Sequence, residues 1–178
     1  MPVLLAPLPT PSPASRRPDL VTAVLPAAPG TIARLDVGVN VLFAGCRTSS
    51  ALVALARQFP RSRFLGIEAS AEVLEAARAA VRIAGLQNTQ AGRPDTLRQA
   101  RLQGIFEFVI RQGGEPAASL DTLPGLLRDG GLLFDLGREL PSPAAYHAAG
   151  LVILRSIRLA DGCACIIAGN WQMPAPRS

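Results

Sequence analysis

Apolar runs and helical patterns alternate along the chain from about residue 31 onward. Short apolar runs predict five strands, at residues 39–44, 63–68, 88–91, 105–110 and 132–136. Helices are expected between them, at residues 49–58, 70–84, 95–103 and 121–128. This alternation favours a mainly parallel, doubly wound α/β sheet, because each connection has to cross one face of the sheet.

Local signals support two of these elements. Ser70 is a suitable N-cap for the helix at residues 70–84, Glu72 lies in its first turn, and Gly85 can end it. The run at residues 105–110 shows little alternation, so we expect that strand to be buried on both faces.

The end of the chain carries a hairpin signal. Asp161 and Gly162 separate two apolar runs, at residues 151–159 and 163–169, after a short helix expected at residues 143–149. An Asp-Gly pair between strand patterns is typical of a β-hairpin. We therefore expect a sheet of about seven strands that closes with an antiparallel pair.

Residues 40–70 form the stretch around which the chain is organised. A strand is followed by a turn that contains Gly45, then by a helix, a second strand and the acid Glu68. This order is the plan of a nucleotide-binding βαβ unit, in which the turn and the helix N-terminus face the ligand and the acid binds ribose hydroxyls.

The two ends of the chain differ from this central part. Eight of the 16 prolines fall within residues 1–30, so we expect a disordered arm there, with a short helical turn near residues 20–25. The domain is expected at residues 31–171, followed by a disordered tail at residues 172–178. Ser15, Arg16 and Arg17 are similar to a twin-arginine export signal, but nearby prolines and a short apolar run favour a polar tail.

Composition narrows the class of protein. The 178 residues are 49% hydrophobic, enough for one domain with a core, and no apolar run reaches the roughly 18 residues that span a bilayer. The net charge of +5 is spread along the chain and aromatics make up only 4%, which disfavours nucleic-acid binding. The three cysteines form no disulfide framework or metal-ligand pattern, so we expect a cytoplasmic protein.

Five segments follow one another in a characteristic order. They read VLFAGCRTS (41–49), RFLGIEAS (63–70), AEVLEAARAAVRIAGLQN (71–88), FEFVI (106–110) and LPGLLRDGGLLFDLG (123–137). In this order the chain resembles the class I S-adenosylmethionine-dependent methyltransferases over roughly residues 35–169. The resemblance implies their Rossmann-like fold, to which the closing hairpin belongs. A nicotinamide-dependent oxidoreductase is disfavoured, because it would continue with parallel strands and G-x-G-x-x-G is absent.

The resemblance implies S-adenosylmethionine as the cofactor and assigns roles by position. Glu68 would bind the ribose hydroxyls, with Ala69 beside the adenine. Arg111 would begin the loop where cofactor and substrate meet. Two further groups complete the implied site: Ala44, Gly45 and Cys46 under the methionine part, and Gly92 and Arg93 near the adenine amine.

Four positions of this expected site depart from the family's pattern. Phe43 stands where an acid helps to order the ammonium end of the cofactor. Arg47 and Ser49 replace the second and third glycines of the turn, and the Arg47 side chain could fold into the pocket or swing out. Arg93 replaces the acceptor for the adenine amine, a role that Asp95 could take if the loop is shifted.

The sequence assigns no catalytic residue and no metal site. A base at His147, which follows Tyr146 in the short helix, is one interpretation, and an exposed helical histidine is the favoured one. Cys163 and Cys165 share one face of a strand, which favours buried packing over metal binding.

Two functions remain open after these observations. The resemblance implies methyl transfer to an oxygen, nitrogen or carbon nucleophile of a small molecule. The alternative is a non-catalytic protein of the same fold that serves as a structural or regulatory partner of another protein. Assembly into a homo-oligomer is left open in both cases.

Overall fold

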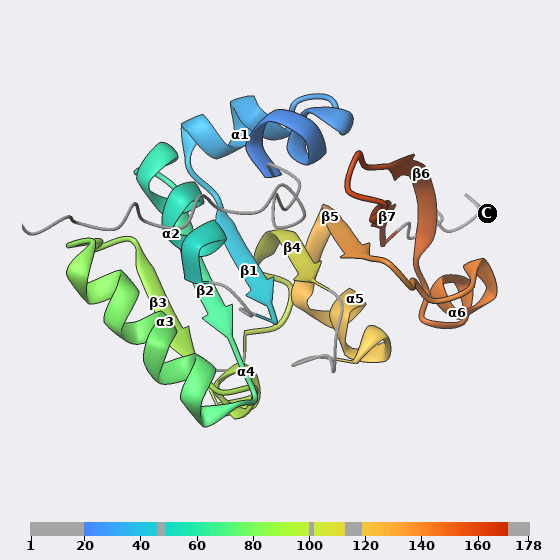
Figure 1. Ribbon diagram of the computed structural model, residues 1–178. Coiled ribbons are helices and arrows are strands. Elements are labelled where there is room, and N and C mark those ends of the chain that lie inside the picture. Colours follow the sequence, from blue (N-terminus) through green and yellow to red (C-terminus); the bar gives the residue numbers. More distant parts are fainter. Residues whose placement is uncertain (1–19, 46–48, 100–101, 113–118, 171–178) are drawn as a thin grey trace, which may run out of the picture.

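A single mixed sheet of seven strands forms the centre of the protein (Figure 1). The computed structural model describes residues 20–45, 49–99, 102–112 and 119–170. The strands are β1 (Asn40–Ala44), β2 (Arg63–Ile67), β3 (Thr89–Gly92), β4 (Phe106–Gln112), β5 (Leu127–Gly137), β6 (Val152–Arg158) and β7 (Ala164–Gly169). Their order is β3-β2-β1-β4-β5-β7-β6, parallel from β3 to β5 and antiparallel at β5–β7 and β7–β6.

Helices cover both faces of this sheet. They are α1 (Thr31–Val37), α2 (Ser49–Gln58), α3 (Ala71–Ile83), α4 (Asp95–Gln99), α5 (Leu123–Leu126) and α6 (Pro143–Ala148), with short turns at Leu20–Val24, Leu25–Ala27 and Leu120–Thr122. On one face, residues from α1 and α2 pack with Phe43, Phe108 and Phe134 of the sheet. On the other face, residues from α4, α5 and α6 pack with Leu42, Val109 and Leu133.

The predicted fold class is confirmed, and most predicted elements lie where the sequence places them. The helix at residues 49–58 and the closing hairpin are present, with Gly162 at φ +80° in the hairpin turn. Ser70 caps α3 by accepting a hydrogen bond from the backbone N–H of Val73, and Gly85 follows the helix at φ +65°. Local signals were sufficient for these elements.

Two elements differ from the prediction, and one helix was not predicted. The fifth strand was expected at residues 132–136, but β5 begins at Leu127 and includes Gly130 and Gly131. A Cβ at Gly131 would lie 3.0 Å from the carbonyl oxygen of Phe106, so this glycine allows close strand approach. The helix expected at 121–128 is correspondingly shorter, and α1 was not predicted at all.

The N-terminal segment also differs from the expected disordered arm. The predicted helical turn is present, and Leu20, Val24 and Leu25 are buried in the core beside α1. Burial of these apolar side chains outweighs the helix-breaking effect of Pro26 and Pro29, so the arm does not extend to residue 30. The rest of the predicted arm and the predicted tail at 172–178 lie outside the described residues.

Within the described ranges, no single helix has both the length and the apolar character needed to cross a membrane. Among the described residues, one bent pair of helices, Leu20–Ala27 and Thr31–Val37, reaches these values when the two are taken together, by length and composition.

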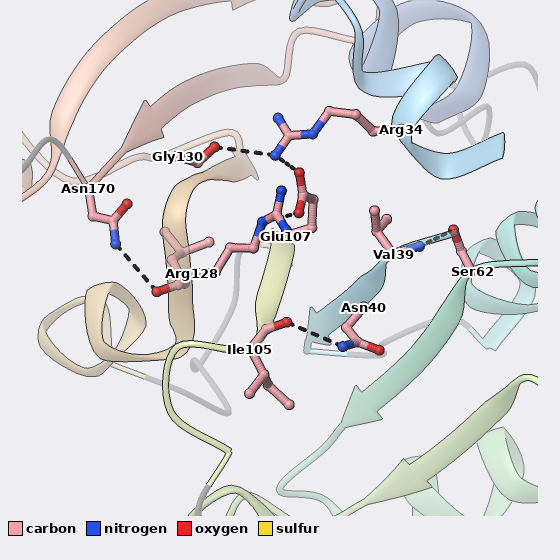
Figure 2. A network of polar contacts seen from close by, with 10 residues as sticks. Arg34, Val39, Asn40, Ser62, Ile105, Glu107, Arg128, Gly130 and Asn170 are labelled. Carbon is pink, nitrogen blue, oxygen red and sulfur yellow. Dashed lines mark hydrogen bonds and ion pairs between the residues drawn. The ribbon is translucent and has the colours of Figure 1, made fainter. Parts of the chain in front are cut away.

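Glu107, near the amino end of β4, forms ion pairs with residues of two neighbouring elements (Figure 2). Its side chain is 2% exposed and forms ion pairs with Arg34 of α1 and Arg128 of β5. Arg34 also donates to the carbonyl oxygen of Gly130 (3.4 Å) and lies 4.8 Å from the centre of the Phe108 ring. One buried carboxylate therefore joins a helix to both central strands.

Glu107→Gln is expected to lower the free energy of unfolding by about 2 kcal/mol, because the amide removes the charge and turns an NH₂ group toward an arginine. Urea unfolding measures the change. Glu139→Gln is the matched control: Glu139 is exposed, so its replacement should change stability by less than about 0.5 kcal/mol. Equal stability of the two variants would contradict the proposed role of Glu107.

Candidate functional site

The carboxyl ends of β1, β2, β3 and β4 meet at one edge of the sheet, where the arrowheads of β1, β2 and β3 point in Figure 1. Gly45 follows β1 at φ +85°, a backbone conformation that side chains rarely adopt. Its N–H donates to the carbonyl oxygen of Ile67 at the end of β2 (3.0 Å). A Cβ at Gly45 would lie 3.0 Å from the carbonyl oxygen of Gln112, so the turn lies against both neighbouring strands.

Glu68 lies directly after β2, beside this turn. Its side chain is largely buried, and Oε1 accepts a hydrogen bond from the backbone N–H of Ser70 (3.0 Å). Its own N–H donates to the carbonyl oxygen of Gly92 at the end of β3 (3.1 Å). The acid expected to bind ribose is therefore held at the edge where a nucleoside would lie in a Rossmann-like fold.

The residues expected near the adenine lie around the ends of β2 and β3. Ala69 is exposed next to Glu68, and Gly92 is buried at the end of β3. A Cβ at Gly92 would lie 2.8 Å from Oγ1 of Thr96, so α4 packs close to this backbone. Arg93 and Asp95 are both exposed.

Phe43, expected near the ammonium end of the cofactor, is packed in the core. It is 0% exposed and belongs to the core on the α1 and α2 side of the sheet, whereas its neighbours Leu42 and Ala44 lie on the other face. The large apolar side chain is stabilised by burial. Ser49 is the first residue of α2, and the expected residues Cys46 and Arg47 lie outside the described residues.

Arg111 was expected to begin the loop after the fourth strand, but the structure places it elsewhere. It lies in β4 and not in a loop, and it pairs in register with Ala44 of β1 and Asp135 of β5. Its Nε donates to Oδ1 of Asp135 (2.8 Å) and its Nη2 donates to Oδ2 (2.7 Å). The hydroxyl of Tyr146 on α6 also donates to Oδ2 (2.6 Å). Asp135 and Tyr146 are 0% exposed and Arg111 is 8% exposed.

This buried triad, composed of Arg111, Asp135 and Tyr146, perturbs two ionisable groups. Burial, the hydrogen bond to Asp135 and the charge of Asp135 raise the pKa of the Tyr146 phenol far above its ordinary value. Burial and the charge of Asp135 raise the pKa of the Cys165 thiol to about 12. Neither group is suited to act as a base near neutral pH.

Asp135 was missed because the sequence interpretation treated its segment only as an apolar strand. An aspartate within the run LLFDL, with an arginine at the end of a neighbouring strand, was the available signal. His147 is exposed, in agreement with the favoured interpretation. Among the described residues, no group of three or more His, Cys, Asp or Glu side chains is arranged to hold a metal ion.

The Tyr146 phenol is expected to stay protonated in the folded protein well beyond pH 10. Tyr146 is the only tyrosine, so the ultraviolet absorbance of tyrosinate reports on it alone. The unfolded chain ionises at a pKa of about 10. Because the folded state holds this proton more tightly, the resulting stability is complete below about pH 10 and declines at higher pH.

The matched measurement for this prediction is a titration of the same protein unfolded in urea, which should show the ordinary tyrosine transition. If the folded protein ionised in the same pH range, the buried hydrogen bond from Tyr146 to Asp135 would be contradicted.

Solved structures with a similar fold include several methyltransferases. No protein-family model and no curated protein matches the sequence. A SAM-dependent methyltransferase from Aquifex aeolicus is 16% identical with a TM-score of 0.61, covering 73% of this chain and 81% of its own. Precorrin-6y C5,15-methyltransferase from Geobacter metallireducens GS-15 is 13% identical with a TM-score of 0.55, covering 76% and 81%.

A third similar structure is a different kind of enzyme by its name. The [4+2]-cyclase SpnF is 17% identical with a TM-score of 0.63, and the match covers 75% of both chains. The expected resemblance is therefore confirmed at the level of the fold: the chain has the Rossmann-like fold of the S-adenosylmethionine-dependent methyltransferases, with its seven-stranded sheet and antiparallel closing pair.

Proposed function

We propose that the carboxyl edge of β1, β2 and β3 binds S-adenosylmethionine and that the protein transfers a methyl group to a small-molecule acceptor. The observation that carries this proposal is the hydrogen bond from Gly45 to Ile67, which brings the turn after β1 next to Glu68. A nucleoside that spans the ends of β1 and β2 requires this juxtaposition of a glycine turn and an acid.

The ribose end of the proposed site fits the residues present. Oε1 of Glu68 already accepts from the backbone of Ser70, which fixes the orientation of the carboxylate. The structure gives Oε2 no partner among the residues that it describes, and a carboxylate oxygen can accept more than one hydrogen bond. Oε2 is therefore the atom that we assign to the ribose hydroxyls.

At the adenine end, the proposed site would bind the base through apolar and backbone contacts and not through a charged acceptor. Exposed Ala69 offers apolar contact beside Glu68, and the backbone of Gly92 closes the end of β3. Arg93 supplies only N–H donors, so it cannot accept a hydrogen bond from the adenine amine.

Methyl transfer at this edge would depend mainly on positioning. When bound, S-adenosylmethionine supplies an electrophilic methyl group attached to a positively charged sulfur. The protein has to align an acceptor atom with that group, and alignment alone can contribute a large part of a rate enhancement. Since the hydroxyl of Tyr146 donates a hydrogen bond to buried Asp135 and His147 is exposed, neither is assigned as a base. An acceptor that is already nucleophilic suits this site.

The alternative, a non-catalytic protein of this fold, is favoured by a separate observation. Phe43 is packed in the core, so the end of β1 offers no side-chain acid to the cofactor's ammonium group. The similarity to a [4+2]-cyclase also means that the fold by itself does not specify methyl transfer. A protein partner would then replace the small-molecule acceptor.

Calorimetric titration with S-adenosylhomocysteine tests the proposal. We expect micromolar binding, weakened about 10- to 100-fold in Glu68→Ala, because a charge-assisted hydrogen bond to the ribose contributes about 1.5–3 kcal/mol.

Ser70→Ala is the matched control. It removes the N-cap of α3 at the same turn and should cost about 1 kcal/mol of stability without changing affinity. Absence of binding at millimolar ligand would reject the cofactor site and leave the non-catalytic alternative. Equal weakening by both substitutions would reject the role of the Glu68 carboxylate.

A further inference from the structure

The buried triad leaves part of one side chain available for a ligand. A guanidinium group has five N–H donors in a planar arrangement that offers two forked edges. Asp135 occupies the edge formed by Nε and Nη2 of Arg111, at 2.8 and 2.7 Å. The other edge, formed by Nη1 and the second N–H of Nη2, has no partner among the residues that the structure describes.

The hydroxyl of Tyr146 completes the environment of Asp135. Its hydrogen bond of 2.6 Å gives the carboxylate a third donor, so both oxygens are occupied. Asp135 therefore makes no hydrogen bond with the second edge of Arg111. Rotation of the guanidinium would break both of its hydrogen bonds to Asp135. This arrangement holds Arg111 in one orientation, with its second edge unoccupied by any residue that the structure describes.

The position of Arg111 places that edge near the candidate cofactor site. Arg111 lies opposite Ala44, the last residue of β1, and precedes Gln112, whose carbonyl oxygen lies against Gly45. The Arg111 side chain is 10% exposed, while its partner Asp135 is completely buried. Arg111 is thus the member of the triad whose side chain a ligand at this edge can contact.

We propose that Arg111 recognises a carboxylate at the carboxyl edge of the sheet through its free forked edge, with Asp135 and Tyr146 as positioning residues. A planar guanidinium edge matches the two oxygens of a carboxylate. The inference deepens the proposed function, on which it rests for the identity of the ligand. The carboxylate belongs either to the amino-acid part of the cofactor or to the acceptor.

The unmodified protein provides the first test. S-adenosylhomocysteine carries a carboxylate, and 5′-methylthioadenosine is a similar nucleoside without one. Benzoate and benzamide form a second pair, compared by NMR titration with the nucleoside site saturated by S-adenosylhomocysteine or, if that does not bind, left empty. We expect at least one carboxylate to bind tenfold or more tightly than its partner. Equal affinity within both pairs would overturn the proposal without any variant.

Arg111→Lys tests the residue itself, because lysine keeps the charge and a bond to Asp135 but loses the forked edge. We expect a tenfold or greater loss of affinity for the preferred carboxylate and little change for its neutral partner. Arg57→Lys, at an exposed position of α2, is the control and should bind as the unmodified protein does. Loss confined to S-adenosylhomocysteine identifies the cofactor's carboxylate, and loss confined to benzoate identifies that of an acceptor.

Tyr146→Phe tests whether Tyr146 orients Arg111 or only stabilises the fold. If Tyr146 only supports the fold, its removal should weaken the charged and neutral members of a pair equally. If it orients Arg111 through Asp135, the ratio of the two affinities should fall severalfold while the neutral compound binds as before. An unchanged ratio would overturn the positioning role.

The outcomes also distinguish this inference from the proposed function. Binding of benzoate that depends on Arg111, without any binding of either nucleoside, would support the anion site and reject the cofactor site. Binding of nucleosides that depends on Glu68, without any preference for a carboxylate, would retain the cofactor site and reject the role of Arg111.

Discussion

The ion pair between Arg111 and Asp135 is the constraint on which the carboxyl edge of the sheet depends. Both residues lie on central strands that helices cover on both faces, where an unpaired charge would cost several kcal/mol. A shift of one residue between β4 and β5 would send the two side chains to opposite faces. Pairing in the observed register is therefore the arrangement that satisfies both charges, and the ion pair helps to specify how the two strands align.

The same strand is anchored at its other end by a second buried carboxylate. Glu107 forms an ion pair with Arg34 of α1 (Figure 2). Arg111 is linked through Asp135 to Tyr146 of α6. Helices α1 and α6 cover opposite faces of the sheet. Polar contacts thus fix β4 to both layers of helices, and the position of Arg111 relative to Gly45 follows from packing across the whole domain.

Local patterns were sufficient to predict the order of strands and helices, but not the contacts that build the site. Helix α3 was predictable because Ser70 and Gly85 mark its ends. Helix α1 was not, because it has seven residues and no side-chain cap. The early start of β5 was not predictable, because one sequence does not distinguish a glycine that allows close strand approach, such as Gly131, from a glycine that reverses the chain.

The contacts of the buried triad were likewise not predictable from local sequence patterns. Arg111 and Asp135 are 24 residues apart, and their contact depends on the register between two strands. No periodic pattern specifies that register in advance. The resemblance placed Arg111 at the start of the loop after the fourth strand, whereas its place within β4 and its contact with Asp135 depend on the packed sheet.

The two ends of the proposed cofactor site differ in the hydrogen-bonding groups that they offer to a ligand. Glu68 keeps an acid where the ribose hydroxyls would lie. At the opposite end, the acid that the resemblance places near an ammonium group is replaced by Phe43, buried in the core, and Arg111, the penultimate residue of β4, carries N–H donors. A guanidinium group offers N–H donors that a carboxylate can accept and has no acceptor for an ammonium group. On our proposal, the ligand that suits both ends combines nucleoside hydroxyls with a carboxylate directed at Arg111, and its amino group points away from that residue.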